Sequence, residues 1–336
     1  MILLDSLYIN NSGGKVLLDY LVQELEKTDL DVFYLFDTRC KNDYKFIPPE
    51  RKIYLKASIF NRYQFYKQKK KRFSKVFCFG NIPPPIKLAC PIYTYFHNVS
   101  LLEQPKTYFL KEKLLKKLKL KFIKYYSDQN NVFIVQSRSV KTLVRKHFKN
   151  NKIHILPFFK QLKSSFTQDI KENKKEDAFV YISNGNTHKN HFSLFKAWEI
   201  LANNNFYPVL HITITSKFTN HIQEVQRLQL KGLKIINHGF CNPVNLYARS
   251  QFLIYPSIAE SFGLGLVEGI KFECEVIASD LDFVLEVCEP YLVFNPYNVN
   301  SIVASVEKAL LDETEVYKTK PIIKNKIKEL IEVLAP

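Results

Sequence analysis

Apolar segments of strand length alternate with longer segments of helical period along almost the whole chain. Residues 1–8 predict a buried strand, and residues 15–25 predict a helix whose apolar face includes Val16. The same succession recurs at residues 178–182 and 192–202, where the apolar face of the helix includes Phe192. An α/β protein is the expected fold class.

Further strands are expected at residues 31–36, 76–79, 91–96, 132–136, 153–156, 209–214, 233–236, 253–255, 276–278 and 291–294. Helices are expected at residues 62–75, 140–148, 221–230, 242–249 and 301–311, and loops at residues 10–14 and 279–283.

The alternation stops over residues 158–177, which are polar and rich in lysine. We therefore expect an N-terminal domain over residues 1–157, a linker over 158–177 and a second domain over 178–318. Residues 319–336 are expected to form a C-terminal helix that packs back toward the first domain. Two linked βα series indicate two doubly wound, Rossmann-like domains facing across a cleft.

Composition narrows the class of protein. A chain of 336 residues with 46% hydrophobic residues can bury the cores of about two domains. The six cysteines show no CxxC or Cys/His ligand spacing, which favours a reduced cytoplasm and no metal site. No secretory leader or bilayer-spanning run is found, so a protein that is soluble or bound to a membrane surface is expected.

The formal net charge of +17 calls for an acidic partner, for which nucleic acid, anionic lipid and phosphorylated substrates all qualify. Much of the excess lies in residues 62–75 and between Lys111 and Lys124. The second run carries apolar residues at helical spacing, among them Leu114 and Leu118, with lysines between them. Such a helix either lies on an anionic membrane or packs on its own domain by that same stripe, and the sequence leaves both open.

The richest segment for chemistry is residues 254–277, which combine a strand, a tight loop and a helix expected to begin at Leu264. Gly263 and Gly265 allow a turn with outward-facing backbone amides, and a helix start favours a phosphate group. Glu260 precedes the helix and Glu268 lies within it, roughly 12 Å apart at helical rise. Two carboxylates flanking a phosphate-binding helix start fit an extended ligand such as a nucleotide sugar.

Four other loops follow expected strands. Gly13 and Gly14 can admit a phosphate or sugar, or form a plain turn. His97 ends a strand and can bind a sugar hydroxyl, or be an ordinary loop histidine. Lys189 can neutralise a diphosphate or be solvated. The pair Gly239 and Phe240 can border a nucleotide base or form a turn.

The run Glu260-Ser-Phe-Gly-Leu-Gly-Leu-Val-Glu268, preceded by Pro256-Ser257, resembles the E-x7-E motif of glycosyltransferase family 4. That family comprises retaining sugar transferases of the GT-B fold, and the resemblance spans nearly the whole chain. It implies that Glu260 contacts hydroxyls of the donor sugar and that Glu268 holds the ribose. The amides of Phe262, Gly263 and Leu264 would meet the sugar or diphosphate.

The resemblance extends to the four loops. It implies that Gly13 and Gly14 form the amino-terminal glycine loop, that His97 faces the sugar, that Lys189 binds phosphate and that Gly239-Phe240 lies beside the base. Glu260, His97 and Lys189 are the residues expected to carry catalysis.

Three positions depart from the family pattern. Asn184 stands where an arginine is common, which shifts neutralisation of the diphosphate toward Lys189. Glu273-Cys274-Glu275 replaces a small Gly-x-Pro turn, which would reshape the donor pocket, and Gly265 replaces a proline.

The sequence thus predicts a retaining, metal-independent transferase that moves a hexose from a nucleoside diphosphate sugar to a glycan or lipid-linked glycan. Assembly of a bacterial-type cell-surface polysaccharide or lipopolysaccharide is the expected setting. The donor is a substrate, and no cofactor and no nucleic acid are expected. The expected location is the cytoplasm, with a peripheral contact at the inner face of the membrane as an open alternative. A nucleic-acid-binding protein and a catalytically silent homologue acting as a partner subunit are the competing interpretations.

Overall fold

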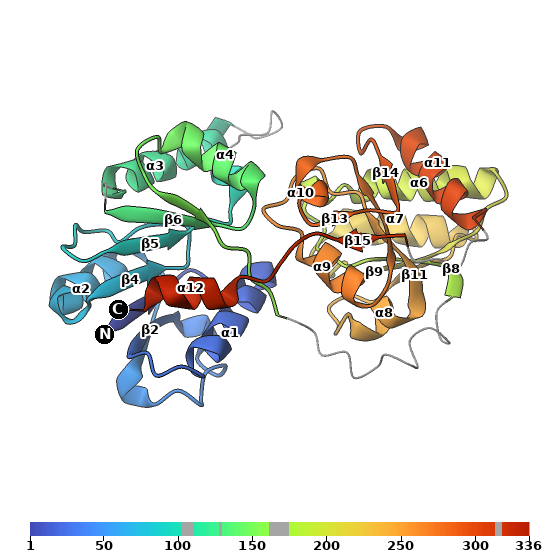
Figure 1. Ribbon diagram of the computed structural model, residues 1–336. Helices are drawn as coiled ribbons and strands as arrows, with labels where there is room; N and C mark the ends of the chain where they lie inside the picture. Colours follow the sequence, from blue (N-terminus) through green and yellow to red (C-terminus); the bar gives the residue numbers. More distant parts are fainter. Residues whose placement is uncertain (103–109, 128–129, 161–174, 313–317, 336) are drawn as a thin grey trace. The chain divides into compact units, whose positions relative to one another are not determined.

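The computed structural model describes residues 1–102, 110–127, 130–160, 175–312 and 318–335. The chain divides into two compact units (Figure 1). The first comprises Met1–Lys160 together with Lys324–Pro336, and the second comprises Gln161–Ile323. Most of the linker expected over residues 158–177 lies outside the described residues.

The first unit is built on a parallel sheet with strand order β3-β2-β1-β4-β5-β6-β7. In chain order its elements are β1 (Ile2–Asp5), α1 (Ser12–Leu25), β2 (Val32–Asp37), β3 (Lys52–Leu55), α2 (Ile59–Lys69), β4 (Lys75–Cys78), β5 (Ile92–Tyr95), α3 (Leu110–Tyr126), β6 (Asn131–Val135), α4 (Arg138–His147), β7 (Ile153–Ile155) and α12 (Ile327–Leu334).

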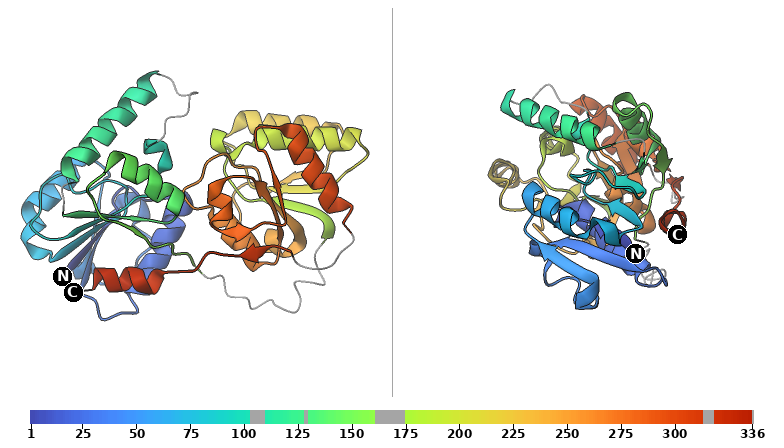
Figure 2. Two further views of the ribbon diagram at one scale, coloured as in Figure 1. Left: turned by 45° about the horizontal axis from the view of Figure 1, so that its top comes forward. Right: turned by 90° about the vertical axis from the view of Figure 1, so that its left-hand side faces the viewer.

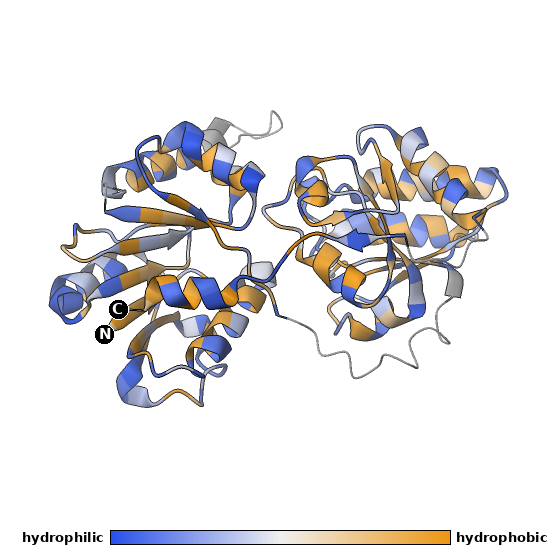
Figure 3. Ribbon diagram, viewed as in Figure 1, coloured by the Kyte–Doolittle hydropathy of each residue, from blue (hydrophilic) through white to orange (hydrophobic). Residues whose placement is uncertain are grey.

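Helices cover both faces of this sheet, so its central strands β1 and β2 are buried along their whole length (Figures 1 and 3). Phe65 of α2 packs against Leu3 and Phe33 of the sheet. Ile123 of α3 and Val144 of α4 pack against its other strands on the same face. The crossover through α1 lies on the opposite face, beside α12. The strand order reverses between β1 and β4, where a doubly wound sheet binds its ligand.

The second unit repeats this plan with strand order β10-β9-β8-β11-β12-β14 and a small antiparallel pair, β13-β15. Its elements are β8 (Lys175–Tyr181), α6 (His191–Asn203), β9 (Val209–Ile212), α7 (Thr219–Leu230), β10 (Ile235–Asn237), α8 (Val244–Arg249), β11 (Ser250–Tyr255), α9 (Leu264–Lys271), β12 (Glu275–Ser279), α10 (Asp282–Leu285), β13 (Cys288–Glu289), β14 (Leu292–Phe294), α11 (Val299–Leu310) and β15 (Lys320–Pro321).

Several local predictions were wrong. Helix α1 begins at Ser12, so Gly13 and Gly14 lie in its first turn rather than in the preceding loop. Val16 and Phe192 are exposed although helical spacing placed them inward. Strand β3 was not predicted because its residues Lys52–Leu55 are only half-buried at the sheet edge and include a lysine. The loop expected at residues 279–283 contains the start of α10.

The basic segment at residues 62–75 is also not uniformly solvated. Arg62 of α2 is fully buried, and its Nε donates to Asp5 Oδ2 over 2.7 Å. Its two terminal nitrogens donate to the carbonyls of Pro83 and Ile82, and Tyr66 donates to the same Asp5 oxygen. Because every partner is inside the protein, this guanidinium contributes to the core of the first unit and not to a surface charge patch.

The unusual Glu273-Cys274-Glu275 run ends α9 and starts β12. Glu273 adopts a left-handed conformation, with φ of 56°, at the position where glycine commonly ends a helix. Glu275 is buried and accepts hydrogen bonds from the backbone amides of Lys318 and Thr319 and from the Thr319 hydroxyl. Glu275 thus fixes the segment through which the chain leaves the second unit. The sequence suggested that this run reshapes a donor pocket, whereas these contacts indicate a structural role.

Breaking the buried pair of Arg62 should destabilise the first unit strongly. Replacing Asp5 by alanine leaves a guanidinium without its counter-charge in the core, which costs about 3–5 kcal/mol. Urea unfolding followed by circular dichroism measures this loss. Glu24→Gln, which breaks the exposed Lys27–Glu24 pair, is the control and should leave the stability almost unchanged. Similar losses for the two variants would contradict the assignment.

Candidate active site

The main cluster of predicted site residues lies at the carboxyl ends of β8 and β11, which are neighbours in the sheet of the second unit. The strand order of this sheet reverses between these two strands. Ligands of open α/β sheets bind at this point. Lys189 follows β8, and Glu260 follows β11.

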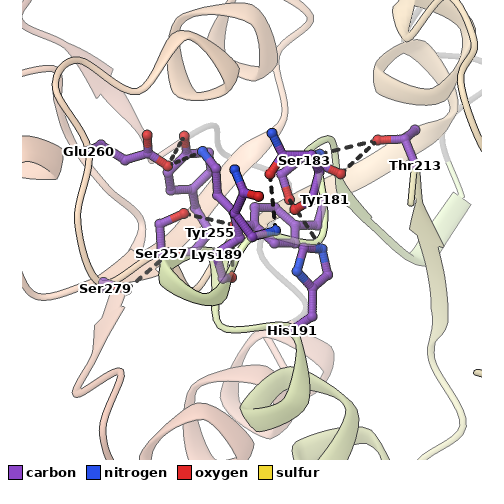
Figure 4. A network of polar contacts seen from close by, with 11 residues as sticks. Tyr181, Ser183, Lys189, His191, Thr213, Tyr255, Ser257, Glu260 and Ser279 are labelled. Carbon is purple, nitrogen blue, oxygen red and sulfur yellow. Dashed lines mark hydrogen bonds and ion pairs between the residues drawn. The ribbon is translucent and has the colours of Figure 1, made fainter. Parts of the chain in front are cut away.

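Lys189 and Glu260 form an ion pair through Nζ and Oε1, although they lie 71 residues apart in the chain. Both side chains are largely shielded from solvent. The hydroxyl of Tyr255, at the end of β11, donates to the same Glu260 oxygen over 3.2 Å. The structure therefore brings together a cation and a carboxylate that the sequence placed in separate loops (Figure 4).

Hydrogen bonds between the two loops hold this pair in place. The buried Tyr181 hydroxyl bonds both the backbone carbonyl of Lys189 and the hydroxyl of Ser257 (Figure 4). The amide of Ile258 donates to the carbonyl of His188 over 2.8 Å. Burial, aided by neighbouring positive groups, lowers the pKa of His191 to about 3, so this residue adds no charge beside Lys189. These hydrogen bonds therefore hold the loops of Lys189 and Glu260 in fixed positions.

Helix α9 begins four residues after Glu260 in the chain. Gly263 has φ of 83°, a conformation that favours glycine, and Leu264 is the first helical residue as predicted. Phe262 is buried and anchors the loop. Close packing against β11 fixes the helix, because a Cβ on Gly269 would lie 2.6 Å from a side-chain atom of Leu253. The aligned peptide dipoles of α9 give this helix start a partial positive charge.

Glu268 lies one turn further along α9, and its Oε2 accepts a hydrogen bond of 3.1 Å from the hydroxyl of Tyr247. Burial raises the pKa of Glu268, and the Tyr247 hydrogen bond acts in the opposite direction. The two motif carboxylates therefore differ in surroundings: Glu260 has a cationic partner, whereas Glu268 has a neutral one.

The remaining predicted residues of the second unit line neighbouring loops. Asn184 follows β8 and accepts a hydrogen bond from the amide of Asn186. Gly239, with φ of 62°, and the almost fully exposed Phe240 follow β10, which β9 separates from β8. The contacts among the described residues do not join Gly239 and Phe240 to the Lys189–Glu260 pair.

In the first unit the structure brings Gly14 and His97 together. The first turn of α1 lies beside the ring, because a Cβ on Gly14 would be in van der Waals contact with His97 Nε2 at 3.5 Å. Gly13 is exposed in the same turn. The sequence did not identify Asn81, whose side-chain oxygen accepts from the amides of His97 and Asn98.

The side-chain nitrogen of Asn81, Nδ2, lies 3.3 Å from His97 Nε2. When Asn81 donates there, the proton of the neutral imidazole is on Nδ1. Burial lowers the pKa of His97 to about 4, so the ring is neutral near pH 7. A neutral ring can hydrogen-bond a sugar hydroxyl.

Other residues missed by sequence reasoning have weak local signals. Tyr181, Tyr247 and Tyr255 read as ordinary core aromatics, and only the folded sheet shows that their hydroxyls face the motif loops. Gly185 is a further case, because a Cβ there would overlap the ring of Phe218 at 2.5 Å. The sequence shows this glycine in the loop after β8. The ring that requires a glycine there belongs to Phe218, which lies 33 residues further along the chain, so no local signal marks the requirement.

The low pKa of His97 predicts a pH-dependent stability. The unfolded chain binds a proton near pH 6.5 and the folded site only near pH 4, so stability is lost as the pH falls between these values. From pH 7 to pH 5 the loss from this group is roughly 2 kcal/mol. Urea unfolding should show that His97→Asn reduces the loss, whereas His154→Asn, at an exposed position, leaves it unchanged. An undiminished loss in His97→Asn would refute neutral burial.

Comparisons with known proteins agree with this arrangement. Sucrose-phosphate synthase from Thermosynechococcus elongatus superposes with a TM-score of 0.73 at 16% identity, covering 93% of this chain and 90% of that one. Anabaena HepE in complex with UDP and glucose gives 0.66 at 14% identity, with coverages of 93% and 89%. WaaG, a glycosyltransferase involved in lipopolysaccharide biosynthesis, gives 0.65 at 12% identity, covering 99% of each chain.

At these identities the solved structures establish the GT-B fold, with its two Rossmann-like domains, and no more. A comparison with curated protein sequences found no significant match. The family model described as "Glycosyl transferases group 1" matches residues 162–329, half of the chain, which contain the Lys189–Glu260 pair and both motif carboxylates. The chain therefore belongs to the glycosyl transferases of group 1.

Proposed function

We propose that the protein is a retaining glycosyltransferase of family 4 that transfers a hexose from a nucleoside diphosphate sugar. The observation that carries the proposal is the shielded Lys189–Glu260 pair at the start of α9. A cation and a carboxylate pair there, and a helix start with its partial positive charge follows four residues after Glu260. A nucleotide sugar carries the complementary groups. Its diphosphate offers anionic oxygens to the cation and to the helix start, and its sugar offers hydroxyls to the carboxylate.

Donor binding exchanges the partners of the ion pair. The diphosphate takes Lys189 and the amides at Phe262, Gly263 and Leu264, while hydroxyls of the hexose donate to Glu260. Each charged group keeps a partner during this exchange, so neither is left buried and unpaired.

The chemical step is departure of the nucleoside diphosphate. Lys189 and the start of α9 stabilise the charge that develops on its oxygen as the glycosidic bond breaks. Because these groups supply the positive charge, the step needs no metal. The acceptor hydroxyl attacks from the same face and passes its proton to the departing phosphate, which retains the anomeric configuration. Glu260 positions the sugar and is not assigned as a base or nucleophile.

The other site residues have supporting roles. Glu268 accepts hydrogen bonds from the ribose, Gly239 and Phe240 lie beside the base, and Asn184 borders the diphosphate. Domain 178–318 would thus bind the donor and domain 1–157 the acceptor, where Gly13, Gly14 and the neutral His97 meet the sugars.

The acceptor is proposed to be a glycan or lipid-linked glycan of a cell-surface polysaccharide or lipopolysaccharide, made in the cytoplasm. Two structural relatives support this choice: WaaG is involved in lipopolysaccharide biosynthesis, and WaaB is a lipopolysaccharide outer core galactosyltransferase.

A contact with an anionic membrane through the segment between Lys111 and Lys124 is proposed on the surface of α3. Leu114, Leu115 and Leu118 are 59%, 55% and 54% exposed, so most of the predicted stripe does not pack on the domain. Ile123, on another side of the helix, is fully buried instead and holds α3 on the sheet. Leucines surrounded by lysines suit the interface of an anionic bilayer. Helix α3 is visible along its length in Figure 2. No described helix is long and apolar enough to cross a membrane.

Two competing interpretations make different predictions. A silent homologue binds the donor without turning it over, and a nucleic-acid-binding protein ignores nucleotide sugars and loses affinity steeply with salt. A thermal-shift screen against common nucleotide sugars, followed by a donor-hydrolysis assay, separates the three. Absence of both binding and turnover in the wild type would end the enzymatic proposal.

Loss of the site cation should abolish most activity. Lys189→Ala removes the group that stabilises the departing diphosphate, and we expect kcat to fall by about 10²–10³-fold, as for loss of one preorganised donor. Donor turnover by the purified variants measures the effect. Lys196→Ala, at an exposed position of α6, is the matched control and should be fully active. Full activity of Lys189→Ala would refute the site assignment.

The membrane contact predicts preferential recovery on anionic vesicles. In cosedimentation, wild-type protein should bind phosphatidylglycerol vesicles more than phosphatidylcholine vesicles, and added salt should weaken the binding. The double substitution Leu114→Ser and Leu118→Ser should reduce binding several-fold. Leu230→Ser, which changes a highly exposed leucine of the second unit, should not. Equal recovery on both vesicle types would exclude the contact.

A further inference from the structure

The hydroxyl of Tyr247 points at the second motif carboxylate from a neighbouring helix. Tyr247 lies on α8, is fully buried, and donates to Glu268 Oε2 over 3.1 Å. Its ring lies parallel to that of Phe272, with centroids 5.8 Å apart. The start of α9 lies beside it, because a Cβ on Gly265 would be in van der Waals contact with the hydroxyl at 3.5 Å. The ring is therefore fixed from two sides with its hydroxyl aimed at one carboxylate oxygen.

We propose that Tyr247 is a positioning residue for nucleotide recognition: it holds the Glu268 carboxylate in the orientation and charge state in which it accepts hydrogen bonds from the ribose. The proposal rests on the function proposed above and adds a residue outside the motif. A ribose diol donates two hydrogen bonds, so it needs an ionised carboxylate with a defined direction. Tyr247 engages one oxygen and leaves the other, Oε1, open to the ligand.

The need for such a residue follows from the surroundings of Glu268. Burial in an apolar site disfavours its ionised form and raises the pKa of the carboxyl. Tyr247 is the hydrogen-bond partner that counters this effect among the described residues. Besides Glu268, the titratable groups that interact with that hydroxyl are Cys274, Tyr181 and Tyr255, and burial raises the pKa of both tyrosines. Glu260, in contrast, has Lys189 as counter-charge.

Tyr247→Phe tests this role with little change in packing, because the ring remains. The variant loses the donor that stabilises the carboxylate, so the pKa of Glu268 rises further and protonation begins at a higher pH. Affinity for a nucleotide should then be lower than in wild type at pH 8 and should fall more steeply toward pH 6. Removing a hydrogen bond to a charged group corresponds to about a tenfold or greater weakening.

The measurement is isothermal titration calorimetry of the full chain with UDP, GDP and ADP, each at pH 8, 7 and 6. Tyr54→Phe is the matched control, since it removes a buried hydroxyl without a hydrogen-bond partner in the described part of the first unit. The nucleotide's own protonation affects all variants equally, so the ratio of each Kd to that of Tyr54→Phe isolates the protein. Glu268→Gln should bind weakly with a ratio that does not change with pH.

Each outcome decides a different point. If Tyr247→Phe binds with the wild-type Kd and pH dependence, the positioning role is overturned while the proposed function stands. If it is weakened by the same factor at every pH, as Glu268→Gln is, orientation is supported and control of charge is overturned. If wild type binds no nucleotide and turns over no donor, the proposed function itself fails. A thermal unfolding scan of Tyr247→Phe confirms that the variant is folded.

Discussion

The ion pair between Lys189 and Glu260 depends on the adjacency of β8 and β11 in a parallel sheet. All carboxyl ends of parallel strands open on one edge, so the loops after these two strands meet wherever the chain reverses strand order. Tyr181 and the amide of Ile258 then tie the loops together. A cation and a carboxylate shielded from water stabilise each other there, and each becomes available to a ligand that brings its own opposite charge.

The two motif carboxylates are held by different partners. Glu260 shares one oxygen between the Lys189 ammonium and the Tyr255 hydroxyl. Glu268 relies on the neutral hydroxyl of Tyr247 in a buried setting. An ion pair tolerates exchange with a diphosphate, whereas a neutral hydrogen-bond donor suits the uncharged ribose. Eight residues of sequence thus carry two distinct environments, set by tyrosines from β11 and α8.

The sequence predicted the strand and helix alternation, the start of α9 at Leu264 and the residues at strand ends, because these depend on local period and on glycine. It did not predict partners that come from distant segments. Tyr247 and Asn81 have no local signal, since their roles depend on which loop the fold brings opposite them. Arg62 appeared only as part of a basic run, because the sequence does not reveal that Asp5 pairs with it in the core. A periodic stripe on α3 likewise did not specify which of its faces would meet the sheet.

The run from Glu273 to Glu275 illustrates how a departure from a family pattern acquires meaning only in the fold. Read along the chain, it sits just after the donor-binding helix and suggests an altered pocket. In space, Glu273 ends α9 in a left-handed conformation and Glu275 turns to the amides of Lys318 and Thr319. Those residues begin the return of the chain, from β15 to α12, into the first unit. A buried carboxylate satisfied by two amides and a hydroxyl anchors that return segment, so substitutions at Glu275 act first on how the chain leaves the second unit.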